Sequence, residues 1–195
     1  MPRSSRRRFE RLAAAEEPHI LPGEQIVFLR TTGKAGDVMT EEEWEEYRAN
    51  NGEIHELGYT SNLCGNYAAL IREGLDAVRE RADEYARREI AAILSLTDRY
   101  RAEAQRMGRN DVAAVLSVVP RKPATTFREA LQFFRILHFS LWLEGCYHNT
   151  VGRFDQYMYP YFAHDLAAGV ETPESAEELL ADFFLSFNKD SDLYP

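Results

Sequence analysis

The fold follows from the stretch Phe127-Arg-Glu-Ala-Leu-Gln-Phe-Phe-Arg-Ile-Leu-His-Phe-Ser-Leu-Trp-Leu143. Thr126 and Glu129 have the Thr-x-x-Glu spacing of a capping box, which predicts that a helix begins here. From Leu131 onward, apolar side chains occupy nearly every side of this helix. Because a helix without a polar face is usually enclosed by other elements, the stretch predicts a central, buried helix.

A second apolar helix is predicted near the end of the chain, where Thr172 is a candidate N-cap and Pro173 lies in the first turn. Burying one large apolar side chain contributes about 1.5–3 kcal/mol, so a row of exposed ones would favour aggregation. The chain has 195 residues, which supply few elements to cover both helices. We therefore expect either a part of a larger folding unit or an oligomer interface, and this argument leaves both open.

The remaining pattern is also mainly helical, with a few short strands. Further segments are predicted as an extended piece at Ile26–Leu29, a capped helix at Glu41–Ala49 after Thr40, a long helical region from Leu63 to Met107, and an apolar piece at Val112–Val119. Gly74 lies inside the long region, where a glycine costs roughly 1 kcal/mol relative to alanine. A bend or a close backbone contact is therefore expected at Gly74.

Composition excludes several classes of function. Subtracting 32 acidic from 23 basic residues gives a formal net charge of −9, which argues against nucleic acid as a partner. Two cysteines offer neither a disulfide framework nor zinc-ligand spacing, so a reducing, cytoplasmic location is expected. No stretch approaches the roughly 18 apolar residues that would cross a membrane.

The first 17 residues are expected to form a basic, flexible arm. Ser5-Arg6-Arg7-Arg8-Phe9 superficially resembles the start of a twin-arginine export signal. Such a signal requires an apolar core immediately afterwards, and charged residues interrupt the short Leu12–Ala15 run. The arm reading is therefore favoured over export.

One motif points to a family. The segment Gly152-Arg-Phe-Asp-Gln-Tyr-Met-Tyr-Pro-Tyr161 strongly resembles the pyruvate formate-lyase-like glycyl radical enzymes, especially their dehydratase branch. Three further pieces are similar to that family in the same order: Pro22-Gly23-Glu24, Asn66-Tyr67 with Gly74-Leu75, and Phe127-Arg-Glu-Ala-Leu-Gln. The resemblance covers residues 18–195.

The resemblance implies the N-terminal portion of a ten-stranded α/β barrel built from two half-barrels. In such enzymes a glycyl radical is installed by a radical S-adenosylmethionine activase and generates a thiyl radical on a cysteine, which abstracts hydrogen from the substrate. It also implies a homodimer when complete. The implied reaction is anaerobic and acts on a small polar metabolite, either as a radical elimination or bond cleavage or as a formate acetyltransferase-like reaction.

This chain does not carry the residues that perform the radical chemistry in that family. Cys64 and Cys146 lie in contexts unlike the family's catalytic cysteine, and no segment resembles its glycine loop. We therefore expect no catalytic residue, metal or cofactor on this chain, which would be inert alone. Three alternatives follow: a fragment of the enzyme, a subunit of a split enzyme completed by another polypeptide, or a non-catalytic helical scaffold.

Asn62 and Asn66 occupy positions where the dehydratases that this chain resembles carry His and Asp residues that line the substrate pocket. An amide donates and accepts hydrogen bonds but takes no proton at neutral pH, so these residues would orient a polar substrate. The alternative for Asn62 is an N-cap of the long helix.

His148, Asn149 and Thr150 form a polar turn whose family counterpart contacts substrate, so they too are candidate binding residues. The alternative is a turn that satisfies its own backbone, with His148 either structural or a titrating pocket group. Arg153 and Asp155 lie among aromatic residues and are predicted to be an architectural ion pair shielded from water.

Overall fold

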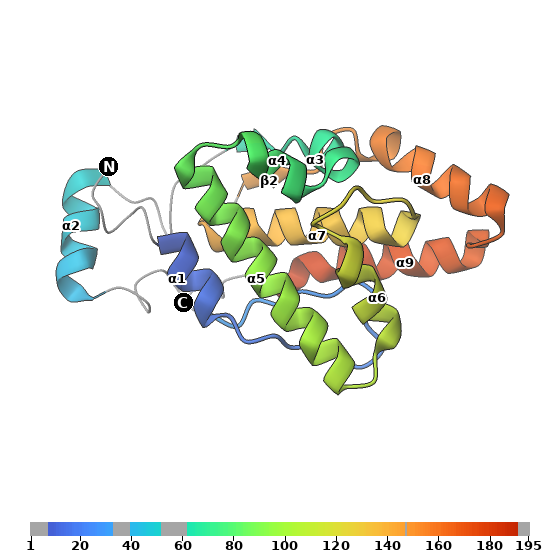
Figure 1. Cartoon of the computed structure of the whole chain (residues 1–195), viewed down its shortest axis with the longest axis horizontal. Helices are drawn as coiled ribbons and strands as arrows, with labels where there is room; N and C mark the ends of the chain where they lie inside the picture. The colour runs from blue at the N-terminus through green and yellow to red at the C-terminus, as the bar shows by residue number, and fades with distance from the viewer. Residues whose placement is uncertain (1–7, 33–39, 52–61, 147, 191–195) are drawn as a thin grey trace.

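The computed structural model describes residues 8–32, 40–51, 62–146 and 148–190, and this part of the chain is mainly helical (Figure 1). This described part contains two short strands. The elements are α1 (Arg8–Ala15), α2 (Glu41–Asn51), β1 (Asn62–Cys64), α3 (Tyr67–Glu73), α4 (Leu75–Arg81), α5 (Glu84–Arg106), α6 (Asn110–Val118), α7 (Phe127–Leu143), β2 (His148–Thr150), α8 (Phe154–Ala168), α9 (Pro173–Ser186) and the 3₁₀ helix η3 (Phe187–Lys189).

Helix α7 is the centre of the structure, as the sequence predicts. Figure 1 shows it running through the middle of the molecule, with α5 crossing it and α9 alongside. Its first half, including Phe134, packs in an apolar cluster with α3, α8 and α9. Its other face, including Phe139, packs in a second cluster with α1, α5 and α6. The predicted capping box is present, because the Thr126 hydroxyl accepts from the Glu129 amide while the Glu129 carboxylate accepts from the Thr126 amide.

The piece expected to be extended at Ile26–Leu29 forms no strand in the described structure, because Ile26 lies in a bend and Phe28 has a φ of 103°. Its residues 26–28 are nevertheless buried. Side chains bond its backbone instead. The Gln132 side chain accepts from the Val27 amide at 2.9 Å and donates to the Val27 carbonyl oxygen at 3.2 Å. Asp182 accepts from the Ile26 amide at 2.7 Å. Because buried backbone groups need partners, these side chains from α7 and α9 hold the segment against the core.

The long helical region divides more than the sequence predicts. Leu63 lies in β1, and the helix predicted over 63–107 is three helices, α3, α4 and α5. The break expected at Gly74 is confirmed, because its φ of 81° separates α3 from α4. A Cβ at Gly74 would lie 2.6 Å from the carbonyl oxygen of Arg121, so the backbone approach requires glycine.

The expected basic arm is partly wrong, because its residues 8–15 form helix α1. Phe9 and Leu12 are buried in the second cluster, and Arg8 forms an ion pair with Glu144 at 2.8 Å. The alternation of charged and apolar residues that excluded an export signal is the pattern of an amphipathic helix. Residues 1–7 lie outside the described part of the chain.

Helix α9 is covered on only one side in this chain. Phe183 is fully buried, whereas the neighbouring Phe184 and Leu185 are 49% and 62% exposed. The predicted cap at Thr172 is present, with Ser175 as its reciprocal partner. Within the described ranges, no helix combines the length and apolar character needed to cross a membrane.

Candidate substrate site at the paired strands

Strands β1 and β2 pair in parallel, although they are far apart in sequence. Asn62 lies opposite His148, Leu63 opposite Asn149, and Cys64 opposite Thr150. The pairing therefore brings together two segments that contain the candidate binding residues. Sequence reasoning selected these segments separately but did not predict that they are neighbours.

Both strands lead into helices at the same edge. Gly65 and Asn66 connect β1 to α3, while Gly152 and Arg153 connect β2 to α8. In sheets of parallel strands, ligands bind beyond the carboxyl ends of the strands, where such connections gather. This edge is consequently the candidate site.

The close approach of the two connections depends on Gly152. Its φ is 62°, in the left-handed region, and a Cβ there would lie 2.8 Å from the Cys64 Sγ. Glycine satisfies both requirements because it has no side chain. Its amide also donates to the Thr150 hydroxyl at 3.1 Å, which orders the turn after β2.

Two of the candidate amides have unused hydrogen-bonding capacity. Asn66 is the N-cap residue of α3, yet its exposed side chain forms no capping hydrogen bond. Asn149 donates from Nδ2 to the Cys146 carbonyl oxygen, while its Oδ1 is buried without a hydrogen-bond partner. A buried acceptor without a partner is costly, so Asn149 is suited to receive a donor from a ligand.

The alternatives for the other candidates are resolved in part. Asn62 belongs to β1 and is not the N-cap of a helix, since α3 begins only at Tyr67. The side-chain positions of Asn62 and His148 lie outside the described part of the structure. Thr150 is exposed and engaged with the local backbone, as the alternative of a self-satisfied turn requires.

Arg153 and Asp155 do approach each other, with Nε and Oδ1 3.6 Å apart. Their side chains are 71% and 76% exposed, however, so the water-excluding environment expected from the sequence is absent in this chain. Phe154 of α8 stacks on Phe183 of α9, whereas Tyr159 is itself 63% exposed, so these two rings do not shield the ion pair from water. The ion pair therefore adds little to the stability of this chain.

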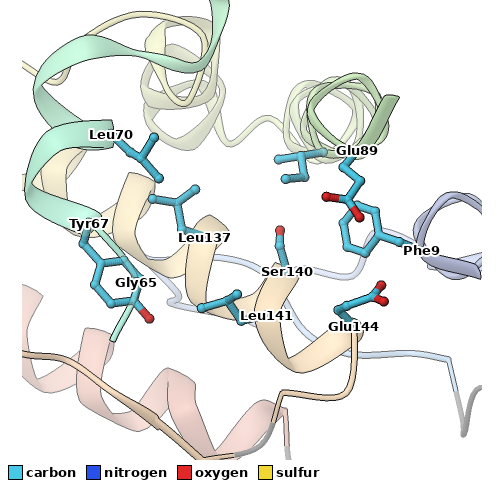
Figure 2. A pocket seen from close by; sticks show the side chains of 10 residues that line it. Phe9, Gly65, Tyr67, Leu70, Glu89, Leu137, Ser140, Leu141 and Glu144 are labelled. Atoms are coloured by element: carbon cyan, nitrogen blue, oxygen red, sulfur yellow. The ribbon is translucent and has the colours of Figure 1, made fainter. Parts of the chain in front are cut away.

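A cavity of about 190 Å³ lies behind the turn between β1 and α3, and α1, α5 and α7 also line it (Figure 2). Its wall is mostly apolar, with Tyr67 and Gly65 at one end and Glu89 and Glu144 at the other. Burial, opposed by a hydrogen bond from Tyr85, raises the pKa of Glu89. In the described residues, no group of three or more His, Cys, Asp or Glu side chains could hold a metal ion.

The comparison with known families is decisive. Residues 29–194 match the family described as pyruvate formate lyase-like. The chain belongs to this family. The match includes β1, β2, and the Gly152–Tyr161 motif, so the resemblance on which the sequence analysis rests is confirmed. No match was found among curated proteins.

Several solved structures share the fold of this chain. A Roseburia inulinivorans protein studied for 1,2-propanediol dehydration superposes with a TM-score of 0.75 at 21% identity, over 100% of this chain and 34% of that one. A glycyl radical enzyme from Archaeoglobus fulgidus superposes with a TM-score of 0.76 at 18% sequence identity, over 98% of this chain and 36% of that one. The B12-independent glycerol dehydratase from Clostridium butyricum superposes with a TM-score of 0.73 at 17% sequence identity, over 98% of this chain and 36% of that one. This chain therefore spans about a third of the length of these solved structures.

Sequence reasoning missed a hydrogen-bonded group beside the cavity, formed by Tyr67, His138 and Trp142. Its signal was available: His138 and Trp142 are four residues apart on an otherwise apolar helix, and side chains at that spacing are neighbours.

Proposed function

We propose that this chain is the N-terminal third of a glycyl radical enzyme of the dehydratase or lyase type and supplies one wall of its substrate pocket. The observation that carries the proposal is the parallel pairing of β1 with β2, which makes neighbours of the two segments that contain the candidate residues, in a chain that matches the family. Proteins of similar structure act on 1,2-propanediol and on glycerol, and this supports a small polar substrate for the complete enzyme.

The role of this wall is to orient the substrate. The free amide of Asn66 and the unpartnered Oδ1 of Asn149 supply donors and an acceptor for hydroxyl groups. Neither amide takes up a proton at neutral pH, so these two residues perform no general-base step. Their contribution is to fix which carbon of the substrate faces the reacting group.

The reacting group is supplied by other segments. In the complete enzyme a glycyl radical, installed by a radical S-adenosylmethionine activase under anaerobic conditions, would supply hydrogen-atom abstraction through a cysteine. We assign no such role to Cys64, whose sequence context differs from that of the family's catalytic cysteine. Its thiol is exposed and lies 3.6 Å from the carbonyl oxygen of Gly65. We further propose a cytoplasmic enzyme that is homodimeric when complete.

A split enzyme is the second candidate, in which a separate polypeptide supplies the cysteine and glycine loops. The exposed apolar side chains of Phe184 and Leu185 favour contact with additional polypeptide and fit both arrangements. The arrangements differ in whether the loops are encoded in the same reading frame or in a neighbouring one.

The test of the wall uses an enzyme completed with the cysteine and glycine loops, from the continuing reading frame or from a co-expressed polypeptide. With 1,2-propanediol or glycerol as substrate, Asn66→Ala and Asn149→Ala are each expected to raise KM about fivefold, the loss of roughly 1 kcal/mol per hydrogen bond. Asn110→Ala, an exposed asparagine on α6, is the matched control. Unchanged KM in both site variants would contradict the proposal.

A further inference from the structure

Tyr67 lines the cavity behind the β1–α3 turn and is the last member of a chain of three hydrogen-bonding side chains. Trp142 Nε1 donates to His138 Nε2 at 3.1 Å, and His138 Nδ1 lies 3.4 Å from the Tyr67 hydroxyl oxygen. Trp142 and His138 are on α7, whereas Tyr67 opens α3. His138 and Tyr67 are buried, with 5% and 2% of their surfaces exposed.

The direction of this chain is determined by its first member. An indole nitrogen can only donate, so His138 Nε2 must accept and carries no proton. A neutral imidazole then carries its proton on Nδ1, which donates to the Tyr67 oxygen. The Tyr67 hydroxyl proton is therefore not used by His138 and is directed to another acceptor. Burial raises the pKa of Tyr67, which keeps that proton in place.

Tyr67 lies at one end of the cavity, beside Gly65 (Figure 2). No described hydrogen bond gives the Tyr67 hydroxyl proton an acceptor in the protein. Leu70, Leu137 and Leu141 form much of the wall between the two ends, and Ile93 also lines the cavity. The far end holds Glu89 and Glu144, and the buried Oε2 of Glu144 has no hydrogen-bond partner.

We propose that this cavity is a binding site for a small neutral molecule with an apolar body and an acceptor oxygen, which receives the hydroxyl proton of Tyr67. The apolar wall selects the body of the ligand, and the donor at one end selects a carbonyl or hydroxyl oxygen. Two carboxyl groups and no basic side chain among the lining residues disfavour anions. Trp142 and His138 act as positioning residues, and the proposal does not depend on the function proposed above.

The test is an NMR titration of the 195-residue chain with cyclohexanone, which accepts a hydrogen bond but donates none. The ketone is expected to shift the resonances of Tyr67, Leu137 and Leu141, and cyclohexanecarboxylate is expected to bind at least tenfold more weakly. Tyr67→Phe is expected to weaken the ketone about tenfold. Tyr157→Phe is the matched control with unchanged affinity, because Tyr157 donates to the Val151 carbonyl oxygen instead.

A second measurement distinguishes whether His138 and Trp142 orient the Tyr67 hydroxyl group or only support the cavity wall. The imidazole ¹⁵N shifts of His138 are expected to report a neutral ring protonated on Nδ1. Trp142→Phe is expected to shift those signals toward the other tautomer and to weaken the ketone in the same direction as Tyr67→Phe. Three results would each overturn the proposal. The first is a proton on Nε2 of His138 in the unmodified protein, and the second is the absence of saturable ketone binding. The third is an affinity of Tyr67→Phe for the ketone equal to that of the unmodified protein.

Discussion

Arg135 and Asp190 form a buried ion pair that joins the central helix α7 to the end of the described chain. Both side chains are completely inaccessible, and one of their two hydrogen bonds, from Nη2 to Oδ1, measures 2.6 Å. The same nitrogen also donates to the Phe28 carbonyl oxygen at 2.6 Å. Phe28 has a φ of 103°, which is strained for a residue with a side chain, and this bond helps to hold it there.

Breaking this ion pair is expected to be severely destabilising. Asp190→Asn leaves the Arg135 guanidinium buried without a counter-charge, which should lower the free energy of unfolding by about 3–5 kcal/mol. Arg135→Met combined with Asp190→Leu removes both charges and should recover most of that loss. Urea unfolding measures the free energy of unfolding of the single variant and of the double variant.

A surface pair provides the control for this prediction. Arg81 and Glu73 are bonded but exposed, so Glu73→Gln should change the free energy of unfolding far less than Asp190→Asn. A similar effect of the two substitutions would mean that the Arg135–Asp190 pair is not buried in solution.

His138 is expected to make the protein sensitive to acid. Burial, together with the nearby Arg135 charge, lowers the pKa of His138 to about 4 from 6.5. The unfolded state therefore binds more protons between these values, and stability falls as the pH falls from about 6.5 to about 4. The loss attributable to His138 is about 3 kcal/mol at pH 4.

The measurement is urea unfolding of the unmodified protein and of His138→Gln at a series of pH values. Gln can still bond both Trp142 and Tyr67 but has no proton to gain. The difference in unfolding free energy between the two proteins should change across that window. A constant difference between pH 7.5 and pH 4 is incompatible with a buried, neutral histidine.

Gly74→Ala should destabilise the protein by at least about 2 kcal/mol, because it combines an unfavourable φ with a clash against the backbone after α6. Gly169 separates the two causes. Its φ is 67°, but nothing lies within 4 Å of its absent Cβ, so Gly169→Ala should cost only about 1 kcal/mol. Thermal unfolding of both variants tests the difference, and equal costs would contradict the close approach.

Thr126→Ala tests the start of the central helix. Losing the side-chain half of the capping box should lower the free energy of unfolding by about 1 kcal/mol. Ser117→Ala, which removes a hydroxyl bonded within α6 to the Ala114 carbonyl oxygen, serves as a comparison. If Thr126→Ala cost no more than Ser117→Ala in chemical denaturation, the cap would not contribute to stability.

The helices were predictable where local signals are strong. Thr126 with Glu129 and Thr172 with Pro173 mark helix starts through contacts only a few residues apart, and both are present in the structure. Gly74 was recognisable because an internal glycine is unfavourable in a helix unless something requires it. The family resemblance rested on contiguous motifs and was equally accessible.

The remaining features depend on distant contacts. Leu63 reads as helical by spacing, but pairing with Asn149 makes its segment a strand. Helix α8 contains Pro160, which a local reading takes as a breaker, yet α7 and α9 support it by packing. Arg153 and Asp155 were expected to be shielded because their sequence neighbours are aromatic, but both side chains are exposed. Phe154 packs against Phe183 and Tyr159 is itself exposed to solvent. Sequence spacing does not contain such information.

The central claim is that this chain is one part of a glycyl radical enzyme whose radical chemistry resides in other segments. Electron paramagnetic resonance after anaerobic activation by a radical S-adenosylmethionine activase tests it most directly. The 195-residue chain alone should give no glycine-centred signal, while the same chain completed with the cysteine and glycine loops should give one and turn over substrate. A glycyl radical or substrate turnover from the 195 residues alone would contradict the account.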